Sequence, residues 1–264
     1  MNEKMPKPLL FRVQFWLIAI LIIAVYVWAF LGMDFAGIQS TAKTVTLSIL
    51  KGFAHPDWSF VHMEGGEDLL SGLLETLIIS LLGTVVSAFV CIPFAFWASA
   101  NMSRGWAASG TGKIVLTIIR VIPELIVAIL FVKAVGPGAF AGVLALGIHS
   151  IGMLAKLYSE TIETIDPGPS EALTASGANR FQVLVFAVLP QVIPQFLSYS
   201  IYRFEINMRS ATTLGLVGAG GIGTALIFAL QTRNWSRVAI ILYGIIVLIT
   251  ITDLISGWLR KKIV

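Results

Sequence analysis

Long apolar stretches without a charged side chain are the feature that most constrains this chain. Four of them, each of about 20 residues or more, fall at 13–33, 76–103, 134–155 and 181–202. The chain is 57% hydrophobic and 12% charged, with a mean hydropathy of +0.89, which is typical of an integral membrane protein rather than a soluble domain. Helices are expected, because lipid offers no partner for backbone polar groups.

Two further stretches are candidate spans although they contain charges. The stretch 238–259 is interrupted only by Asp253. The stretch 114–133 contains Arg120 and Glu124, which are one helical turn apart and could pair within a continuous helix. We therefore predict an all-α protein with six transmembrane helices.

The stretch 210–232 is uncharged but unusually rich in glycine, which weakens a helix by about 1 kcal/mol per residue relative to alanine. A seventh span would also place the basic tail 260–262 on the opposite side from the basic N-terminus, against the positive-inside rule. We expect this stretch to be re-entrant or packed between helices. Its structural glycines are Gly218, Gly220, Gly221 and Gly223.

Basic residues also predict the orientation. Lys4, Lys7 and Arg12 precede the first stretch, which is too long for the core of a cleavable signal peptide and is predicted to be a retained span. With six spans, both termini lie on one side, and the positive-inside rule makes that side cytoplasmic. The acidic loop 34–75 is then extracytoplasmic, and arginines at 203, 209, 233 and 237 crowd the last outer connection.

A polar loop at 166–180 separates two predicted spans. Asp166-Pro167-Gly168-Pro169 ends the preceding helix, because proline cannot continue one. Ser170 is a plausible N-cap, Glu171 lies near the positive helix end, and Gly177 can end a short helix. Such a helix could dock in a groove of a partner and transmit its movement, although an ordinary helical hairpin loop would also fit the pattern.

The same loop resembles the EAA loop of ABC importer permeases. Five of the seven fixed positions match, and Leu173 and Ala187 stand where the family prefers Ala and Ile; the matching residues are Glu171, Ala172, Gly177, Leu189 and Pro190. The resemblance implies a cytoplasmic coupling helix within an EAA loop at about 166–190. The residues expected to contact an ATPase are Glu171, Ala172, Leu173, Gly177, Ala178 and Asn179.

No nucleotide site of its own is predicted for this chain. The stretch 109–113 is similar to a P-loop, but Ala107 replaces its first glycine and Ile114 its magnesium-binding hydroxyl residue. The stretch 218–223 satisfies G-x-G-x-x-G, yet no acidic residue follows at the distance that a dinucleotide site needs. The single cysteine, Cys91, cannot form an internal disulfide. The net charge of +4 gives no support for nucleic-acid binding, and no metal ligands are predicted.

Ionisable residues within spans are costly and therefore candidates for the solute pathway. Arg120 has Glu124 four residues on, and Arg209 has Glu205 four residues back, so both could be paired within a helix. Arg203 has no carboxylate at helical spacing, and it is the best candidate for a cation that serves an anionic solute, unless it reaches the interface near the end of its span. His149 could contact solute or be a satisfied core histidine.

Longer matches resemble the phosphonate ABC transporter permeases. They cover about residues 68–262 and include 198–212, 217–223, 140–146, 165–169 and 177–179. The resemblance implies the type I ABC importer permease fold, with a transmembrane helix and outer loop in 1–67 and a permease core of five transmembrane helices in 68–264. The implied location is the cytoplasmic membrane of a prokaryote.

The same resemblance implies the partners and the solute. The partners are a cytoplasmic ATPase dimer, which binds ATP and Mg, a second permease subunit, either identical or similar, and an extracytoplasmic solute-binding protein. The solute is a phosphorus oxyanion, most simply phosphonate. The chain would be a permease and not an enzyme. Two alternatives are a permease for another small solute such as an amino acid, and an intramembrane protease that uses His149, although 107–110 lacks the first glycine of G-x-S-G.

Overall fold

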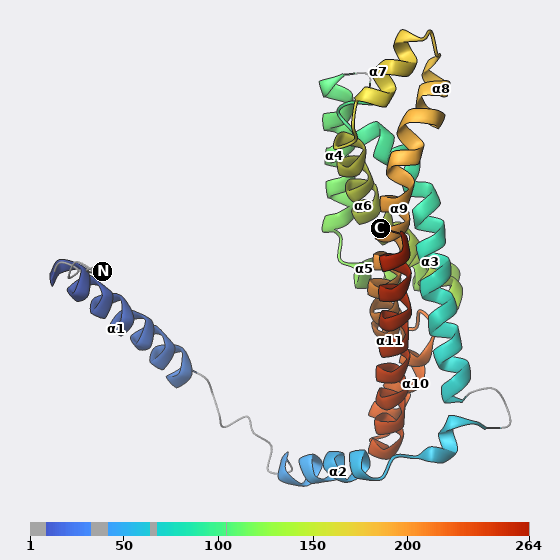
Figure 1. The fold of residues 1–264 in the computed structure, drawn as a ribbon. Coiled ribbons are helices and arrows are strands. Elements are labelled where there is room, and N and C mark those ends of the chain that lie inside the picture. Colours follow the sequence, from blue (N-terminus) through green and yellow to red (C-terminus); the bar gives the residue numbers. More distant parts are fainter. Residues whose placement is uncertain (1–8, 33–41, 64–67, 104, 264) are drawn as a thin grey trace. The chain divides into compact units, whose positions relative to one another are not determined.

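The computed structural model describes residues 9–32, 42–63, 68–103 and 105–263, and the described part is helical without a strand. The chain divides into two compact units, residues 1–48 and 49–264. The first unit contains α1 (Leu9–Leu31), an apolar helix with exposed side chains (Figure 1). Lys4, Lys7 and the predicted end of the first span at Met33 lie outside the described residues, as do 34–41 and 64–67 of the predicted outer loop.

The second unit begins within α2 (Ala42–Ala54) and contains all the remaining elements. They are η2 (Trp58–Val61), α3 (Leu69–Ala98), α4 (Trp106–Val121), α5 (Glu124–Val135), α6 (Ala139–Glu163), α7 (Gly168–Ala175), α8 (Arg180–Val183), the π-helical turn η3 (Leu184–Val188), α9 (Leu189–Leu214), η4 (Gly215–Val217), α10 (Ile222–Gln231) and α11 (Trp235–Ile263). In Figure 1, α7 lies at one end of this bundle, the α7 end, and α10 lies toward the other, the α10 end.

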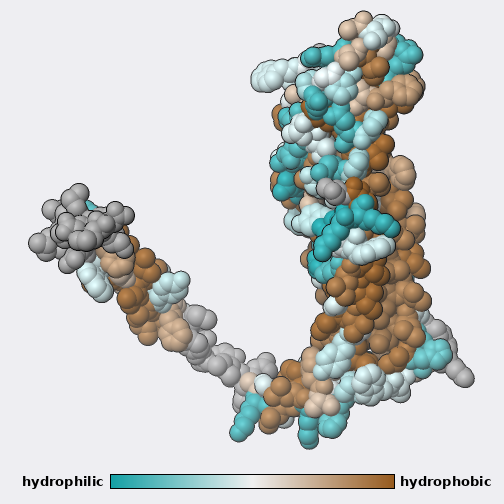
Figure 2. Space-filling model, in the orientation of Figure 1, coloured by the Kyte–Doolittle hydropathy of each residue, from teal (hydrophilic) through white to brown (hydrophobic). Residues whose placement is uncertain are grey.

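Five described helical segments are long and apolar enough to cross a membrane: Gln14–Leu31, Leu69–Ala98, Ala139–Glu163, Arg180–Val217 and Trp235–Ile263. A sixth span is possible if α4 and α5 count as one, although they are bent by 78°. The length and composition of the helices thus confirm the prediction of six spans, with α4 and α5 counted as one. Figure 2 shows the hydrophobic surface that α3 and α11 present, where Phe89 and Leu254 are exposed.

The predicted continuous helix over 114–133 is wrong, and Pro123 explains the break. Proline disfavours helix in the residue before it, and Ile122 is extended with ψ 122°. Arg120 therefore ends on α4 and Glu124 begins α5, and the two form no ion pair among the described residues. The pairing expected between them is also wrong.

Small residues let the helices of the core approach closely. A Cβ at Gly83 of α3 would lie 2.9 Å from Leu146 Cβ of α6. Toward the α7 end, the Tyr158 ring stacks on Phe196 of α9 at 3.8 Å between centroids, and the Tyr158 hydroxyl donates to the Phe196 carbonyl oxygen at 3.1 Å. The buried Tyr158 hydroxyl thus finds a partner inside the bundle, as an apolar environment requires.

The glycine-rich stretch 210–232 contains no spanning helix. It includes the end of α9, η4, a turn and the ten-residue α10. A Cβ at Gly220 would lie 2.6 Å from Ala139 N, and one at Gly221 would lie 2.6 Å from Thr76 Oγ1, while both glycines adopt positive φ. These backbones therefore pack directly against α6 and α3, which only glycine permits.

Candidate functional site

A stripe of polar side chains on α9 faces the interior of the bundle. Arg203, Asn207 and Ser210 recur at helical spacing, and all three are buried. Asn207 donates through Nδ2 to Thr84 Oγ1 of α3 at 2.8 Å and to Ser150 Oγ of α6 at 3.1 Å. The stripe therefore joins three helices through hydrogen bonds that neither composition nor spacing revealed.

Arg203 is the costliest member of the stripe, because it is buried and forms no ion pair with a carboxylate among the described residues. The residue is 4% exposed, its Nε donates to Ser150 Oγ at 2.9 Å, and its Nη1 lies 3.2 Å from Met153 Sδ. Its Nη2 is buried with no hydrogen-bond partner among the described residues. The alternative that Arg203 reaches the interface near the end of its span is wrong, since α9 continues to Leu214.

Glu124 and His149 lie beside this stripe, at the break between α4 and α5. Both Glu124 carboxylate oxygens accept from Ser210 Oγ, at 2.9 and 3.0 Å, and Glu124 Oε2 is 3.9 Å from His149 Nε2. His149 also interacts electrostatically with Arg203, and its Nδ1 is buried with no partner among the described residues. The two alternatives for His149, contact with solute and a core histidine, therefore both remain predictions.

The opposite side of α9 carries two ion pairs to α11. Glu205 pairs with Arg260 at 2.7 Å, and Arg209 pairs with Asp253 at 2.6 Å. The expected pair between Glu205 and Arg209 within α9 is therefore wrong, because both side chains have closer partners on the neighbouring helix. Arg203 and Arg209 also lie within α9 itself, which corrects their placement in an outer connection.

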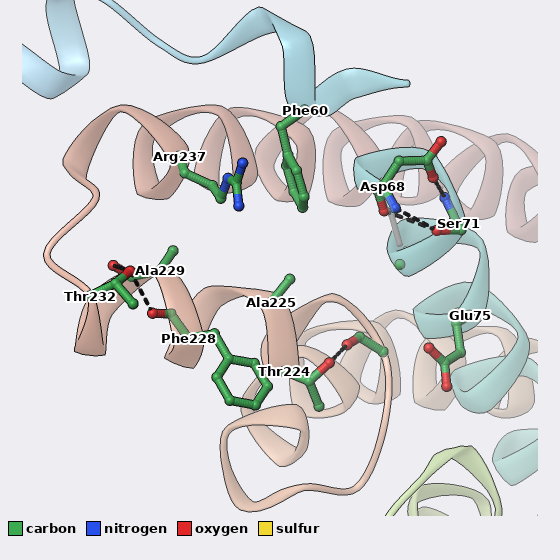
Figure 3. Close-up of a pocket in the computed structure, with 12 residues that line it drawn as sticks. Phe60, Asp68, Ser71, Glu75, Thr224, Ala225, Phe228, Ala229, Thr232 and Arg237 are labelled. Atoms are coloured by element: carbon green, nitrogen blue, oxygen red, sulfur yellow. Dashed lines mark hydrogen bonds between the residues drawn. The ribbon is translucent and has the colours of Figure 1, made fainter. Parts of the chain in front are cut away.

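Arg237 forms one wall of a pocket of about 540 Å³ near the start of α11 (Figure 3). Its guanidinium lies 4.7 Å from the centre of the Phe60 ring and 3.6 Å from Asp57 Oδ2. In Figure 3, residues of α10 lie across the pocket from Arg237. The figure also shows the Glu75 carboxylate of α3, which lines the same pocket. Of the predicted site residues, only Gly221 lines this pocket.

The predicted coupling helix is present as α7 and has no buried residue. It begins at Gly168, three residues earlier than an N-cap at Ser170 would place it, so Ser170 is not its N-cap. Gly168 N donates to Asp166 Oδ1 at 2.9 Å instead. Gly177 follows the helix with φ 85°, and Ala178 N donates to the Leu173 carbonyl oxygen at 3.0 Å. Gly177 thus ends the helix as predicted, in the left-handed conformation that suits glycine.

The chain leaves α7 through a second capped turn. Asn179 Oδ1 accepts from Gln182 N at 2.9 Å, and Gln182 Oε1 accepts from Asn179 N at 2.8 Å, which is a capping box for α8. Gln191 Oε1 accepts from Asp166 N at 3.0 Å and so ties the two ends of the loop together. Pro190 follows the π-helical turn η3, where the missing N–H is accommodated. Glu171, Ala172 and the other predicted contact residues are therefore presented on a fixed scaffold.

Comparison with known proteins decides the family. Residues 91–264 match the family described as "Binding-protein-dependent transport system inner membrane component". The chain belongs to this family. It is 44% identical to the phosphite transport system permease protein PtxC of Stutzerimonas stutzeri over 78% of this chain and 73% of that protein. It is 42% identical to the phosphate-import permease protein PhnE of Mycolicibacterium smegmatis over 71% of this chain, but it spans only 35% of that protein.

Solved structures agree on the fold of this permease. An inward-facing structure of the MetNI methionine ABC transporter has a TM-score of 0.64 and 20% identity, and the match covers 74% of this permease and 96% of that chain. A bacterial ABC transporter for the import of alginate gives a TM-score of 0.54 at 15% identity, and it covers 94% of this permease and 96% of that chain. The chain is thus a multi-pass membrane protein with the permease fold of type I ABC importers, and a transport subunit rather than an enzyme.

The structure distributes the predicted site residues of this permease over separate places. Arg203 and His149 lie together with Glu124, which was expected only as a partner of Arg120, and with Ser150 and Asn207, which were not among the predicted site residues. Glu205 and Arg209 face α11, Arg120 is exposed on α4, and residues 171–179 lie at the α7 end. No group of His, Cys, Asp and Glu in the described ranges could hold a metal ion. The signal in the sequence that Glu124 begins a separate helix was Pro123, which immediately precedes it.

Proposed function

We propose that this permease carries a phosphorus oxyanion across the cell membrane of a prokaryote in an importer driven by a separate ATPase. The observation that carries the proposal is the burial of Arg203, which is 4% exposed as a residue and whose Nη2 has no hydrogen-bond partner among the described residues. The relatives named above are permeases for phosphite and phosphate, and a third, 47% identical over 46% of this chain, is described as a putative cryptic phosphonate transport permease of Escherichia coli.

The physical argument rests on the cost of burial. A guanidinium within a membrane segment is expensive unless it is paired, and such groups face pathways or interior cavities. Its planar fork donates several hydrogen bonds in the geometry that phosphate-like oxygens accept. A passing oxyanion would supply the charge and the acceptor that Arg203 lacks. Phosphonate, phosphite and phosphate all present such oxygens.

The orientation and the partners complete the proposal. Both termini and α7 face the cytoplasm, where Glu171 and the neighbouring contact residues dock on an ATPase dimer that binds ATP and Mg. A second permease subunit completes the pathway, and an extracytoplasmic binding protein delivers the anion at the α10 end. Closure of the ATPases moves the two α7 helices together and switches the spans between inward- and outward-facing states.

Uptake in cells tests this proposal. Deletion of the gene should abolish uptake of at least one of phosphite, methylphosphonate and limiting phosphate as sole phosphorus source, while methionine uptake is unchanged. Complementation with the intact gene should restore it. Unchanged uptake of all three phosphorus sources, or loss of methionine uptake alone, would refute the solute assignment.

A further inference from the structure

The groups around Arg203 specify more than a negative charge. Building on the proposed function, we propose that the cluster Arg203, His149 and Glu124 binds the phosphorus oxyanion with one proton shared between the anion and Glu124. The transported species in this site is therefore the monoanion, whose one P–OH group donates to the Glu124 carboxylate. Arg203 and His149 face the unprotonated oxygens, and Glu124 faces the protonated one.

The free polar atoms of the cluster match such a ligand. Among the described residues, neither the donor Arg203 Nη2 nor the buried His149 Nδ1 has a hydrogen-bond partner. Glu124 accepts from Ser210, and a carboxylate has about four acceptor positions, so it retains capacity for another donor. Two nitrogens without a hydrogen bond and a carboxylate with spare acceptor capacity suit an anion that both accepts and donates hydrogen bonds.

Charge leads to the same conclusion. The cluster holds one guanidinium and one carboxylate, and both interact electrostatically with His149. A dianion would add two negative charges beside Glu124, and like charges at hydrogen-bond distance cannot both be accommodated without a proton between them. The second ionisation of phosphate monoesters falls at about pH 6, so an anion of this kind readily gains or loses one proton near neutral pH.

The three members of the cluster differ in their exposed fraction. The side chains of His149 and Glu124 are 18% and 27% exposed, whereas Arg203 is 4% exposed as a residue. The carboxylate and the imidazole are therefore the more accessible members of the cluster, and Arg203 is the least accessible.

Other charged groups do not supply the proton. On the opposite side of α9, Glu205 and Arg209 are paired to Arg260 and Asp253 of α11. The α3 helix contributes the uncharged Thr84 to the cluster, and Arg120, at the end of α4, is exposed and forms no ion pair with Glu124 among the described residues. Glu124 and His149 are thus the two groups to separate by experiment.

Proton linkage measured by calorimetry tests the inference. Phosphite is titrated into the purified permease–ATPase complex in lipid nanodiscs at pH 8, without binding protein or nucleotide, in two buffers of different ionisation enthalpy. The wild type should take up about one proton per anion bound. Glu124→Gln should take up none, whereas Glu205→Gln, a carboxylate change on the other side of α9, should behave as the wild type. Sulfate, a dianion that carries no proton at this pH, should bind the wild type at least about tenfold more weakly than phosphite.

Several results would overturn the inference. They are equal proton uptake by the wild type and Glu124→Gln, loss of proton uptake in His149→Gln with uptake retained in Glu124→Gln, equal affinity for sulfate and phosphite, and no binding of either anion. The sulfate comparison uses only the wild type, so the test survives if Glu124→Gln does not fold. Phosphite uptake by the intact importer combined with any of these results rejects this inference alone, whereas absence of phosphorus uptake rejects the proposed function with it.

Discussion

Glu205 of α9 accepts a 2.7 Å hydrogen bond from Arg260 of α11, although Arg209 stands one helical turn away on its own helix. Arg209 instead pairs with Asp253 at 2.6 Å. Two ion pairs therefore connect α9 to α11 on the side away from the polar stripe. They leave Arg203 as a buried cation of α9 that has no carboxylate partner among the described residues.

The pair between Glu205 and Arg260 should contribute measurably to stability. Arg260→Met leaves the Glu205 carboxylate, which is 9% exposed, without its partner. Breaking a buried pair costs about 3–5 kcal/mol, and because the Arg260 side chain is 35% exposed we expect about 2 kcal/mol here. Thermal unfolding of the detergent-solubilised protein measures the loss. Adding Glu205→Gln should recover more than half of it, and a double variant no more stable than Arg260→Met would contradict the assignment.

Close packing at the glycine-rich turn predicts a different sensitivity at two helical glycines. A Cβ at Gly223 of α10 would clash with the Thr212 carbonyl oxygen, whereas one at Gly110 of α4 meets nothing within 4 Å. Gly223→Ala should therefore cost about 3 kcal/mol, as overpacking against backbone does. Gly110→Ala should be neutral or stabilise by about 0.5–1 kcal/mol. Unfolding temperatures of the two variants check this, and equal temperatures would refute it.

The cap of α3 predicts a pH dependence. Ser71 N donates to Asp68 Oδ1 at 2.8 Å, and this bond, aided by those from the Ser71 hydroxyl, Met63 and His62, lowers the pKa of Asp68 to about 2. The ordinary value is about 3.9, so the stabilisation is present above that pH and is lost as the pH falls through the folded pKa. Asp68→Asn should lower the unfolding temperature at pH 6–8, and the difference should close between about pH 4 and 2.

Asp68→Ser also removes the charge and keeps an N-cap oxygen, so its unfolding temperature should follow that of Asp68→Asn across this pH range. Its difference from the wild type should close between about pH 4 and 2 as well, because the wild type is the protein that loses a charge there. A difference between Asp68→Asn and the wild type that stays constant down to pH 2 would contradict the role of the carboxylate.

Transport should depend on α7 without a matching effect on folding. Glu171 is exposed on a helix with no buried residue, so Glu171→Ala should change stability by no more than about 1 kcal/mol through the helix dipole. ATP-driven uptake should nevertheless fall at least about tenfold, because this helix is the proposed contact with the ATPase. Ser176→Ala, at the C-cap of the same helix, is the control. Full uptake by Glu171→Ala with membrane insertion intact would refute the contact.

Much of the fold could be predicted because length and hydropathy determine a membrane span largely by themselves. The stretch 238–259 became α11, and 210–232 did not form a span, since its glycines pack against other backbones. The end of α7 could also be predicted from local sequence, because Gly177 adopts the positive φ that is common where a helix ends. In these places local sequence and tertiary structure favour the same conformation.

The errors arose where a tertiary contact or a local breaker overrode helical spacing. Arg120 and Glu124 have the spacing of an ion pair, but Pro123 breaks the helix between them. Arg209 and Glu205 lie on a continuous helix, yet partners on α11 are closer. The cluster around Glu124 could not be predicted, because it joins residues that are 86 positions apart in the chain.

The central claim is that Arg203 serves the transported anion, and uptake of phosphite into proteoliposomes with the complete importer tests it most directly. Hydrogen bonds from charged groups contribute about 1.5–3 kcal/mol, so Arg203→Met should reduce ATP-dependent uptake about 10- to 100-fold, with partial recovery in Arg203→Lys. Lys43→Ala, an exposed cation of α2, should leave uptake unchanged. Equal uptake by Arg203→Met and the wild type, with the complex assembled in both, would contradict the claim.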